Sequence, residues 1–295
     1  NKNLAMNNTK KKSPISWVPT AYFAMGLPFV VLNMVTVLMF KGLEVDDKLI
    51  TFWTSLILLP WTLKPLWSPF LELFRTKKFF VVVTQLITGV TFGLVAFALN
   101  LSHFFSISIA LLAIVAFSGA THDIACDGVY MSELSNEDQA KFIGWQGAFY
   151  NIAKILATGG LVYLAGYFIE LNADAGLLTA NKRAWMIILL ILSVTMILLG
   201  IYHLFALPST QSASSKKTLR SNKEVMKELG QVLMDFFRKT HITYYICFII
   251  LYRFAEGFVM KIVPLFLKAD REMGGLGLNE KEIGLYYGTY GAAAF

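Results

Sequence analysis

The fold is decided by a long apolar stretch, residues 104–131, which reads FFSISIALLAIVAFSGATHDIACDGVYM. An α-helix needs about 20 apolar residues to cross the roughly 30 Å of hydrocarbon in a membrane, and this stretch is longer. Its second half nevertheless carries two acids, Asp123 and Asp127, within a polar run at 118–128. The stretch therefore predicts a membrane-spanning helix, 103–131, whose charged groups face away from lipid.

Similar apolar blocks fill the rest of the chain. Of its 295 residues 56% are hydrophobic and only 15% are charged, whereas a soluble domain carries about 25% charged residues. We expect an all-α membrane protein with seven spanning helices and the start of an eighth: 16–40, 49–70, 79–100, 103–131, 141–169, 183–206, 242–267 and from 281 onward. Because the last block stops within a span, at Phe295, we also expect the chain to be truncated at its C-terminus.

The placement of charge favours a lipid bilayer over nucleic acid as the partner of this chain. The formal net charge is +7, but the basic residues cluster in the breaks between apolar blocks rather than over one soluble face. Lys and Arg are more frequent in the breaks on the side of the N-terminus, for example at 10–12 and 75–78. Since positively charged loops stay inside the cell, a multi-pass protein with a cytoplasmic N-terminus is predicted.

Cysteine and histidine usage gives no sign of a metal, a cofactor or an enzyme. The two cysteines, Cys126 and Cys247, both lie in apolar blocks, and no CxxC or Cys/His metal spacing occurs. The sequence also has no phosphate-cradling loop, and its predicted outer loops are short. We therefore expect no cofactor, no metal site and no catalytic residue.

The pattern divides the chain into three regions. They are a six-helix bundle at 1–207, a cytoplasmic linker with an amphipathic helix at 208–240, and the start of a second bundle at 241–295. A solvated linker is the alternative for the middle region. Segments 42–50 and 275–283 share Gly, Leu, Lys and Ile in register, with Asp46 and Asn279 as predicted N-caps. Parallel repeats of six helices are the plan of the two halves of major facilitator transporters.

The polar run on the fourth predicted helix carries the candidate coupling residues. Asp123 and Asp127 are four residues apart, so they share one helix face. Two close carboxylates repel each other when both are ionised, which favours proton binding by one of them. We interpret both as proton-coupling acids and His122 as a proton relay. The alternatives are that Lys64 and Lys154 are permanent partners of the two acids and that His122 is a packing residue.

Polar side chains on four predicted helices are candidates for lining a substrate cavity. They are Tyr22, Asn33, Trp61, Lys64, Asn151, Lys154, Arg253 and Glu256. Each ionisable group among them is costly at bilayer depth, which favours a role facing a watered space. The alternative for Trp61 is aromatic packing, and the alternative for Arg253 and Glu256 is a local ion pair.

Two structural roles are also predicted within the spans. Gly144 and Gly147 lie on one face of the fifth helix, where glycine lets a neighbouring helix approach closely. Lys261, in the second half of the seventh helix, is interpreted as a snorkelling side chain whose ammonium reaches the membrane surface.

Two stretches carry a family resemblance. Residues 63–72, LKPLWSPFLE, and 120–127, ATHDIACD, are similar to motifs of the AmpG-type branch of the major facilitator superfamily, which includes acetyl-CoA transporters. The resemblance implies the major facilitator fold, with an N-terminal six-helix bundle and the first one to two helices of the C-terminal bundle. It also implies that Asp123 and Asp127 are coupling or cavity acids and that Lys64 is a buried cation near the inner gate.

The resemblance further implies a proton-driven permease of the bacterial inner membrane that imports a cell-wall-derived muropeptide or amino sugar. The sequence departs from the family pattern at Glu72, where Asp is usual, and at His122, where Gln is frequent. Alternative substrates within the same fold are acetyl-CoA, a folate-like compound or a simple sugar, and a membrane sensor without transport is a further alternative. We expect a monomer whose partners are a small solute, protons and the bilayer.

Overall fold

Helices form all of the secondary structure in the described residues, as the sequence predicts. The computed structural model describes residues 12–68, 71, 76–208, 227, 230–231, 234–235 and 237–291. Within 242–268 it describes only the backbone of 249–250 and 253–256. The predicted amphipathic helix of the linker therefore lies largely outside the described residues.

Six helices are long and apolar enough to cross a membrane. Their bounds are Pro14–Gly42, Asp47–Leu66, Lys77–Ala98, Phe104–Glu133, Asn136–Leu171 and Leu177–Ala206. Each coincides with one of the first six predicted spans. The seventh predicted span, 242–267, forms the 27-residue helix α12 (Ile242–Lys268), which is not one of these six. By length and composition, six such helices suit a multi-pass membrane protein.

Several spans change helix type along their length. The first consists of η1 (Pro14–Ser16), α1 (Val18–Val30), η2 (Val31–Val35) and α2 (Thr36–Gly42). The second consists of α3 (Asp47–Leu56), α4 (Leu59–Leu63) and η3 (Lys64–Leu66). The fifth consists of α8 (Asn136–Ile155), η4 (Leu156–Leu161) and α9 (Val162–Leu171).

The remaining elements are simpler. The third, fourth and sixth spans are the single helices α6 (Lys77–Ala98), α7 (Phe104–Glu133) and α10 (Leu177–Ala206). Short turns η5 (Ala173–Ala175) and η7 (Arg271–Met273) follow α9 and α12. The described chain ends in α13 (Glu280–Glu282) and η8 (Ile283–Gly291), where the eighth predicted span begins.

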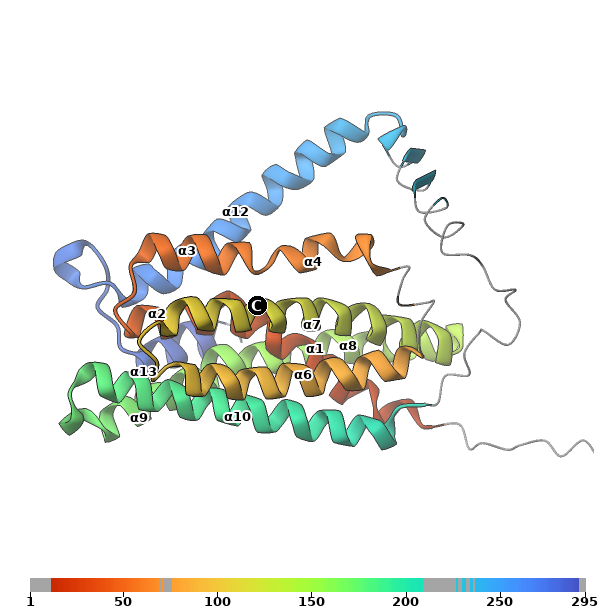
Figure 1. Ribbon diagram of the computed structural model, residues 1–295. Helices are drawn as coiled ribbons and strands as arrows, with labels where there is room; N and C mark the ends of the chain where they lie inside the picture. Colours follow the sequence, from red (N-terminus) through yellow and green to blue (C-terminus); the bar gives the residue numbers. More distant parts are fainter. Residues whose placement is uncertain are drawn as a thin grey trace, which may run out of the picture.

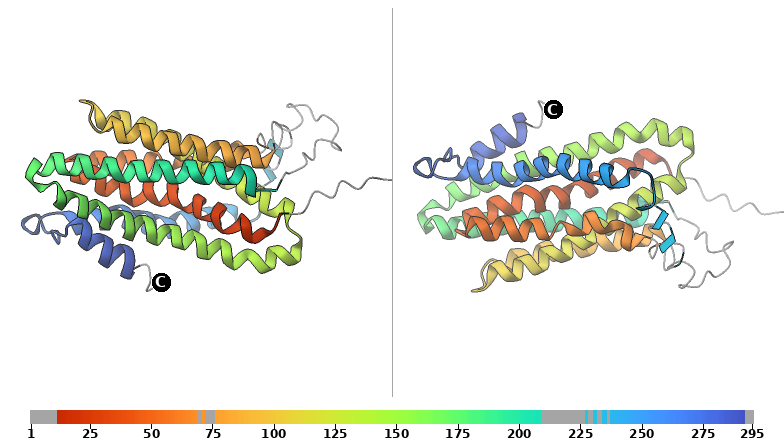
Figure 2. Two further views of the ribbon diagram at one scale, coloured as in Figure 1. Left: turned by 90° about the horizontal axis from the view of Figure 1, so that it is seen from below. Right: turned by 90° about the horizontal axis from the view of Figure 1, so that it is seen from above.

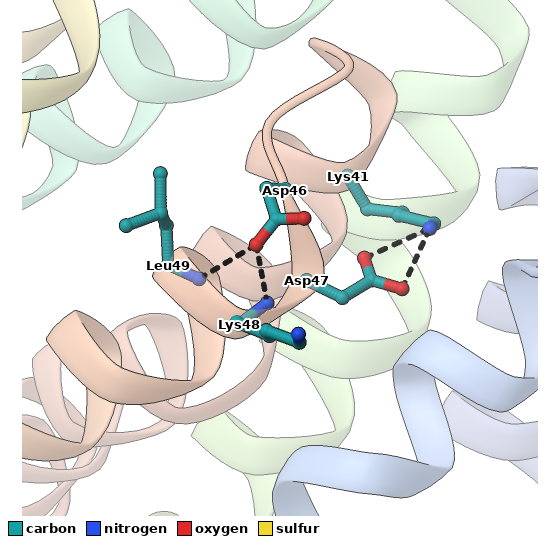
Figure 3. A network of polar contacts seen from close by, with 5 residues as sticks. All are labelled: Lys41, Asp46, Asp47, Lys48 and Leu49. Carbon is teal, nitrogen blue, oxygen red and sulfur yellow. Dashed lines mark hydrogen bonds and ion pairs between the residues drawn. The ribbon is translucent and has the colours of Figure 1, made fainter.

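Both predicted N-caps are confirmed. The Asp46 carboxylate accepts hydrogen bonds from the backbone N–H groups of Lys48 at 2.9 Å and Leu49 at 3.3 Å, which satisfies two free donors at the start of α3 (Figure 3). Asn279 accepts from the backbone of Glu282, whose side chain accepts from the Asn279 N–H in return. The two segments compared in the sequence therefore begin their helices by the same chemistry.

The described helices form one elongated bundle in Figures 1 and 2, in which α6 packs along both α7 and α10 and α1 packs against α8 and α7. Large apolar side chains with no exposed surface fill its core, among them Leu32, Phe92, Leu112 and Trp185. Helix α12 contacts α2, η2 and α3. Its first turns point away from the bundle in Figure 1.

Glycines allow α13 and η8 to lie directly against α9 and η4. A Cβ atom at Gly288 would stand 2.1 Å from the carbonyl oxygen of Thr158, and one at Gly166 would stand 2.5 Å from the backbone nitrogen of Lys281. By contrast, nothing in the described chain lies within 4 Å of a Cβ placed at Gly144 or Gly147. The prediction of close helix packing at those two positions is therefore wrong, because the tight glycine contacts of this span lie in its C-terminal half, at Gly159 and Gly166.

Candidate functional site

The polar run of α7 meets the broken second span at Asp123. The Lys64 ammonium lies 2.6 Å from Asp123 Oδ2, and the Trp61 indole N–H donates to the same oxygen at 2.9 Å. Only 10% of the Asp123 side chain is exposed, against 27% of the Lys64 side chain. The site is thus a nearly buried carboxylate that is neutralised by one lysine and also accepts from an indole.

The break in the second span brings both donors to the acid. Helix α3 ends at Leu56, and α4 begins at Leu59 with a proline in its first turn, because proline lacks the N–H that a continuous helix would use. Trp61 and Lys64 are three residues apart, so they project from the same side of the short helix that follows. The sequence predicted both residues as candidates.

The second acid of the run has a different environment. Asp127 is exposed, and its Oδ1 atom accepts a hydrogen bond of 2.9 Å from the Tyr22 hydroxyl on α1. The Tyr22 ring also meets the edge of Tyr130, with ring centroids 5.9 Å apart. The two acids therefore differ, since Asp123 is held in an ion pair whereas Asp127 is exposed and held by a tyrosine.

Only half of the permanent-pair interpretation is found in the described residues. Lys64 does pair with Asp123. Lys154 is exposed on α8, and no ion pair joins it to Asp127 within the described part of the chain. Asn151, one turn before Lys154, is exposed on the same helix. These two polar residues of α8 thus stay candidates for contact with a solute.

His122 belongs to a buried chain of polar side chains that crosses four helices. Gln85 Nε2 lies 2.9 Å from His122 Nε2, and Gln85 Oε1 lies 2.8 Å from His203 Nδ1. The other ring nitrogen of His203 lies 2.9 Å from the Thr20 hydroxyl. Gln85 and His203 are fully buried, and His122 is 3% exposed. These hydrogen-bonded side chains join α1, α6, α7 and α10 next to Asp123 in the sequence of α7.

The Gln85 amide fixes the tautomers of both histidines. Its nitrogen donates to His122 Nε2, so the proton of neutral His122 is on Nδ1, while its oxygen accepts from His203 Nδ1. The Nδ1 atom of His122 is buried without a hydrogen-bond partner in the described residues. A carboxamide between two imidazoles does not pass a proton in its normal form, which weakens the interpretation of His122 as a relay along this chain.

Sequence reasoning missed Gln85, His203 and Thr20. Gln85 could have been identified from the sequence, since an amide in an otherwise apolar helix needs a hydrogen-bond partner when it is buried. The partners themselves have no local signature, because they lie on helices that meet only in the folded chain.

The remaining predicted residues are placed as follows. Asn33 is buried in η2 and donates to the Phe29 carbonyl oxygen at 3.0 Å. Among the described residues, no hydrogen bond joins Asn33 to Asp123. The side chains of Arg253 and Glu256 lie outside the described residues, and the predicted ion pair between them stays a prediction.

Lys261 does not snorkel. It is 5% exposed, and its ammonium donates to the backbone carbonyl oxygens of Asn33 at 3.1 Å and Thr54 at 3.4 Å. The prediction is wrong because the carbonyl oxygens of η2 and α3 supply polar partners inside the bundle, so the side chain does not need the membrane surface.

No group of three or more His, Cys, Asp or Glu residues in the described chain is placed to hold a metal ion. Comparison of the sequence with models of known protein families and with curated proteins finds no match.

Proposed function

We propose that the chain is a proton-coupled secondary transporter of the major facilitator type, which imports a cell-wall-derived muropeptide or amino sugar across the bacterial inner membrane. The observation that carries the proposal is the Lys64–Asp123 pair, with an N–O distance of 2.6 Å, within the set of apolar spans. The proposal assigns no catalytic residue and no cofactor to the chain, and it takes the N-terminus to be cytoplasmic.

The cost of the pair supports this function. On insertion scales, one Asp or Lys at the centre of a spanning helix costs about 2.5–3.5 kcal/mol of insertion free energy. Replacing a buried ion pair by apolar residues is often neutral or stabilising, so the pair is weak support for a purely structural role. A carboxylate that can take up a proton, next to a lysine that then loses its partner, gives a transporter two charge states at one site.

The surroundings of the pair suit a polar solute. Asp127 is exposed one turn from Asp123, and Tyr22 donates to it. Asn151 and Lys154 are exposed on α8, which packs against the same helix α1. The choice of a muropeptide or amino sugar comes from the resemblance of 63–72 and 120–127 to the AmpG-type branch. Acetyl-CoA, a folate-like compound and a simple sugar are the alternative substrates.

Uptake into proteoliposomes tests the proposal. The purified full chain is reconstituted with a more acidic exterior, and radiolabelled anhydro-muropeptide, N-acetylglucosamine, acetyl-CoA and glucose are offered separately. We expect accumulation of one of the first two compounds, and its loss on addition of an uncoupler. Accumulation of acetyl-CoA or glucose instead would contradict the substrate class, and absence of accumulation for all four would contradict the transport proposal.

The variant Asp123→Asn, which removes the ionisable group at similar size, tests the named residue. We expect it to lose gradient-driven uptake while still exchanging labelled for unlabelled solute across the membrane. The matched control is Asp174→Asn, because Asp174 is exposed in η5 and away from the site. Wild-type, uncoupler-sensitive uptake by Asp123→Asn would remove Asp123 from the mechanism.

A further inference from the structure

The two oxygens of the Asp123 carboxylate have unequal surroundings. Oδ2 accepts from both the Lys64 ammonium at 2.6 Å and the Trp61 indole at 2.9 Å. Oδ1 is buried and has no hydrogen-bond partner in the described residues. A carboxylate oxygen with two donors has little capacity left for a third, so the free lone pairs of this group are on Oδ1.

The indole of Trp61 is held from two sides. A Cβ atom at Gly119 would stand 2.8 Å from Trp61 Cζ2 and 3.1 Å from Cη2, so only glycine at this position leaves room for the ring. Gly119 lies one turn before Asp123 on α7, so the ring rests on the backbone of the helix that carries the acid. The Phe29 ring meets the indole edge to face, with centroids 5.3 Å apart.

This seating sets where the indole N–H points. A ring in contact with the α7 backbone and with Phe29 has few orientations open to it, since interior side chains are close-packed. The N–H therefore stays aimed at Oδ2. The predicted role of Trp61 in lining a substrate cavity is disfavoured because Gly119 and Phe29 already occupy space around the ring, which favours the alternative of aromatic packing.

We propose that Trp61 is a positioning residue for Asp123, whose indole holds Oδ2 beside Lys64 and leaves Oδ1 as the atom that takes the transported proton. In this step an O–H bond forms at Oδ1, the proton comes from a hydronium ion that becomes water, and the carboxylate becomes a neutral carboxylic acid. The identity of the proton as the transported one rests on the proposed function. The position of the indole beside Oδ2 does not depend on that function.

Infrared difference spectroscopy of the reconstituted full chain tests the inference without a transported solute. The protonated carboxyl group has a C=O stretching band that vanishes when the group ionises, and the part due to Asp123 is the part that is absent in Asp123→Asn. We compare the pH midpoint of this band in wild type and in Trp61→Phe, which keeps an aromatic ring between Gly119 and Phe29 but lacks the N–H donor. Trp145→Phe is the matched control, because Trp145 is 40% exposed on α8.

Loss of a donor to the ionised carboxylate favours the protonated form. We expect the midpoint in Trp61→Phe to move to higher pH by about one unit, a tenfold gain in proton affinity. Gly119→Ala, which displaces the ring but keeps the N–H, should move it in the same direction, and Trp145→Phe should leave it unchanged.

Two results would overturn the inference: an unchanged midpoint in Trp61→Phe, or the absence of any band that depends on Asp123. The first would leave the proposed function standing, provided that Asp123→Asn still loses gradient-driven uptake. Conversely, a shifted midpoint together with wild-type uptake by Asp123→Asn would keep the positioning role of Trp61 and remove its link to transport.

Discussion

A double-mutant cycle on the Lys64–Asp123 pair gives the sharpest prediction about stability. Lys64→Met leaves a carboxylate of which only 10% is exposed without its cation. Removing one partner of a buried pair typically costs about 3–5 kcal/mol. Asp123→Asn should cost less, about 1–3 kcal/mol, because 27% of the Lys64 side chain is exposed and its ammonium can turn toward water.

The double variant Lys64→Met/Asp123→Asn should lose much less than the sum of the single losses. It leaves no uncompensated charge, and replacing both members of a buried pair is often close to neutral. We therefore expect a coupling free energy of at least about 2 kcal/mol, within the range observed for residues in direct contact. The assay is the free energy of unfolding of the purified full chain, measured by titrating SDS into mixed micelles.

The Lys41–Asp47 pair serves as the control cycle (Figure 3). Its N–O distance is 2.8 Å, but 24% of the lysine and 45% of the aspartate side chain are exposed. An exposed pair of this kind is worth about 0.2–1 kcal/mol. The reasoning would be refuted if the losses of the two single variants at Lys64 and Asp123 added up to the loss of the double variant within about 0.5 kcal/mol. The pair would then behave as two independent residues.

Two further predictions concern the contact between the fifth span and the last described helices. Gly288→Ala forces a Cβ atom to within 2.1 Å of the Thr158 carbonyl oxygen, so the same SDS titration should show a loss of about 1–3 kcal/mol. Gly144→Ala, which meets open space, should show no loss, and equal losses for the two variants would contradict the assigned packing. The Glu170 carboxylate accepts a hydrogen bond from Lys281 and raises the pKa of that ammonium above its ordinary 10.5. Because the pKa of Lys281 is higher in the folded state, the contact should stabilise the chain below pH 10.5, and this stabilisation should be lost as the pH rises through the folded-state pKa. Lys281→Met should lack this loss of stability at alkaline pH. Identical curves of stability against pH for Lys281→Met and wild type would count against the contact.

The spanning helices follow from run length in the sequence. A helix satisfies its own backbone hydrogen bonds, so length and apolarity are sufficient to predict it. The predicted 79–100 compares with Lys77–Ala98, and the predicted 103–131 with Phe104–Glu133. The π segments η4 and η8 were not predicted, because they form where the two helices meet through glycine, and this contact depends on the fold.

The candidate site was predictable residue by residue but not as an arrangement. Sequence reasoning selected Trp61 and Lys64 because polar and charged side chains stand out in an apolar helix. It did not show that both reach one oxygen of Asp123, since that depends on how α4 lies against α7. It also missed the Gln85–His203 contact, because an interhelical hydrogen bond leaves no spacing in the sequence.

The prediction for Lys261 was wrong for the same reason, because the partners of its side chain depend on how the helices meet in the folded chain. A lysine near the end of an apolar helix usually extends toward the membrane surface. Here the carbonyl oxygens of Asn33 and Thr54 receive its ammonium inside the bundle. These acceptors come from two other spans, so the sequence around Lys261 carries no trace of them.

The central claim is that a proton enters together with the solute by way of Asp123. Its most direct test is the internal pH of proteoliposomes, followed by a trapped pH-sensitive dye when anhydro-muropeptide is added outside without an imposed pH gradient. The account predicts that solute entry acidifies the interior of wild-type vesicles and of Asp174→Asn vesicles, but not of Asp123→Asn vesicles. Solute entry without acidification in wild type, or equal acidification in Asp123→Asn, would contradict it.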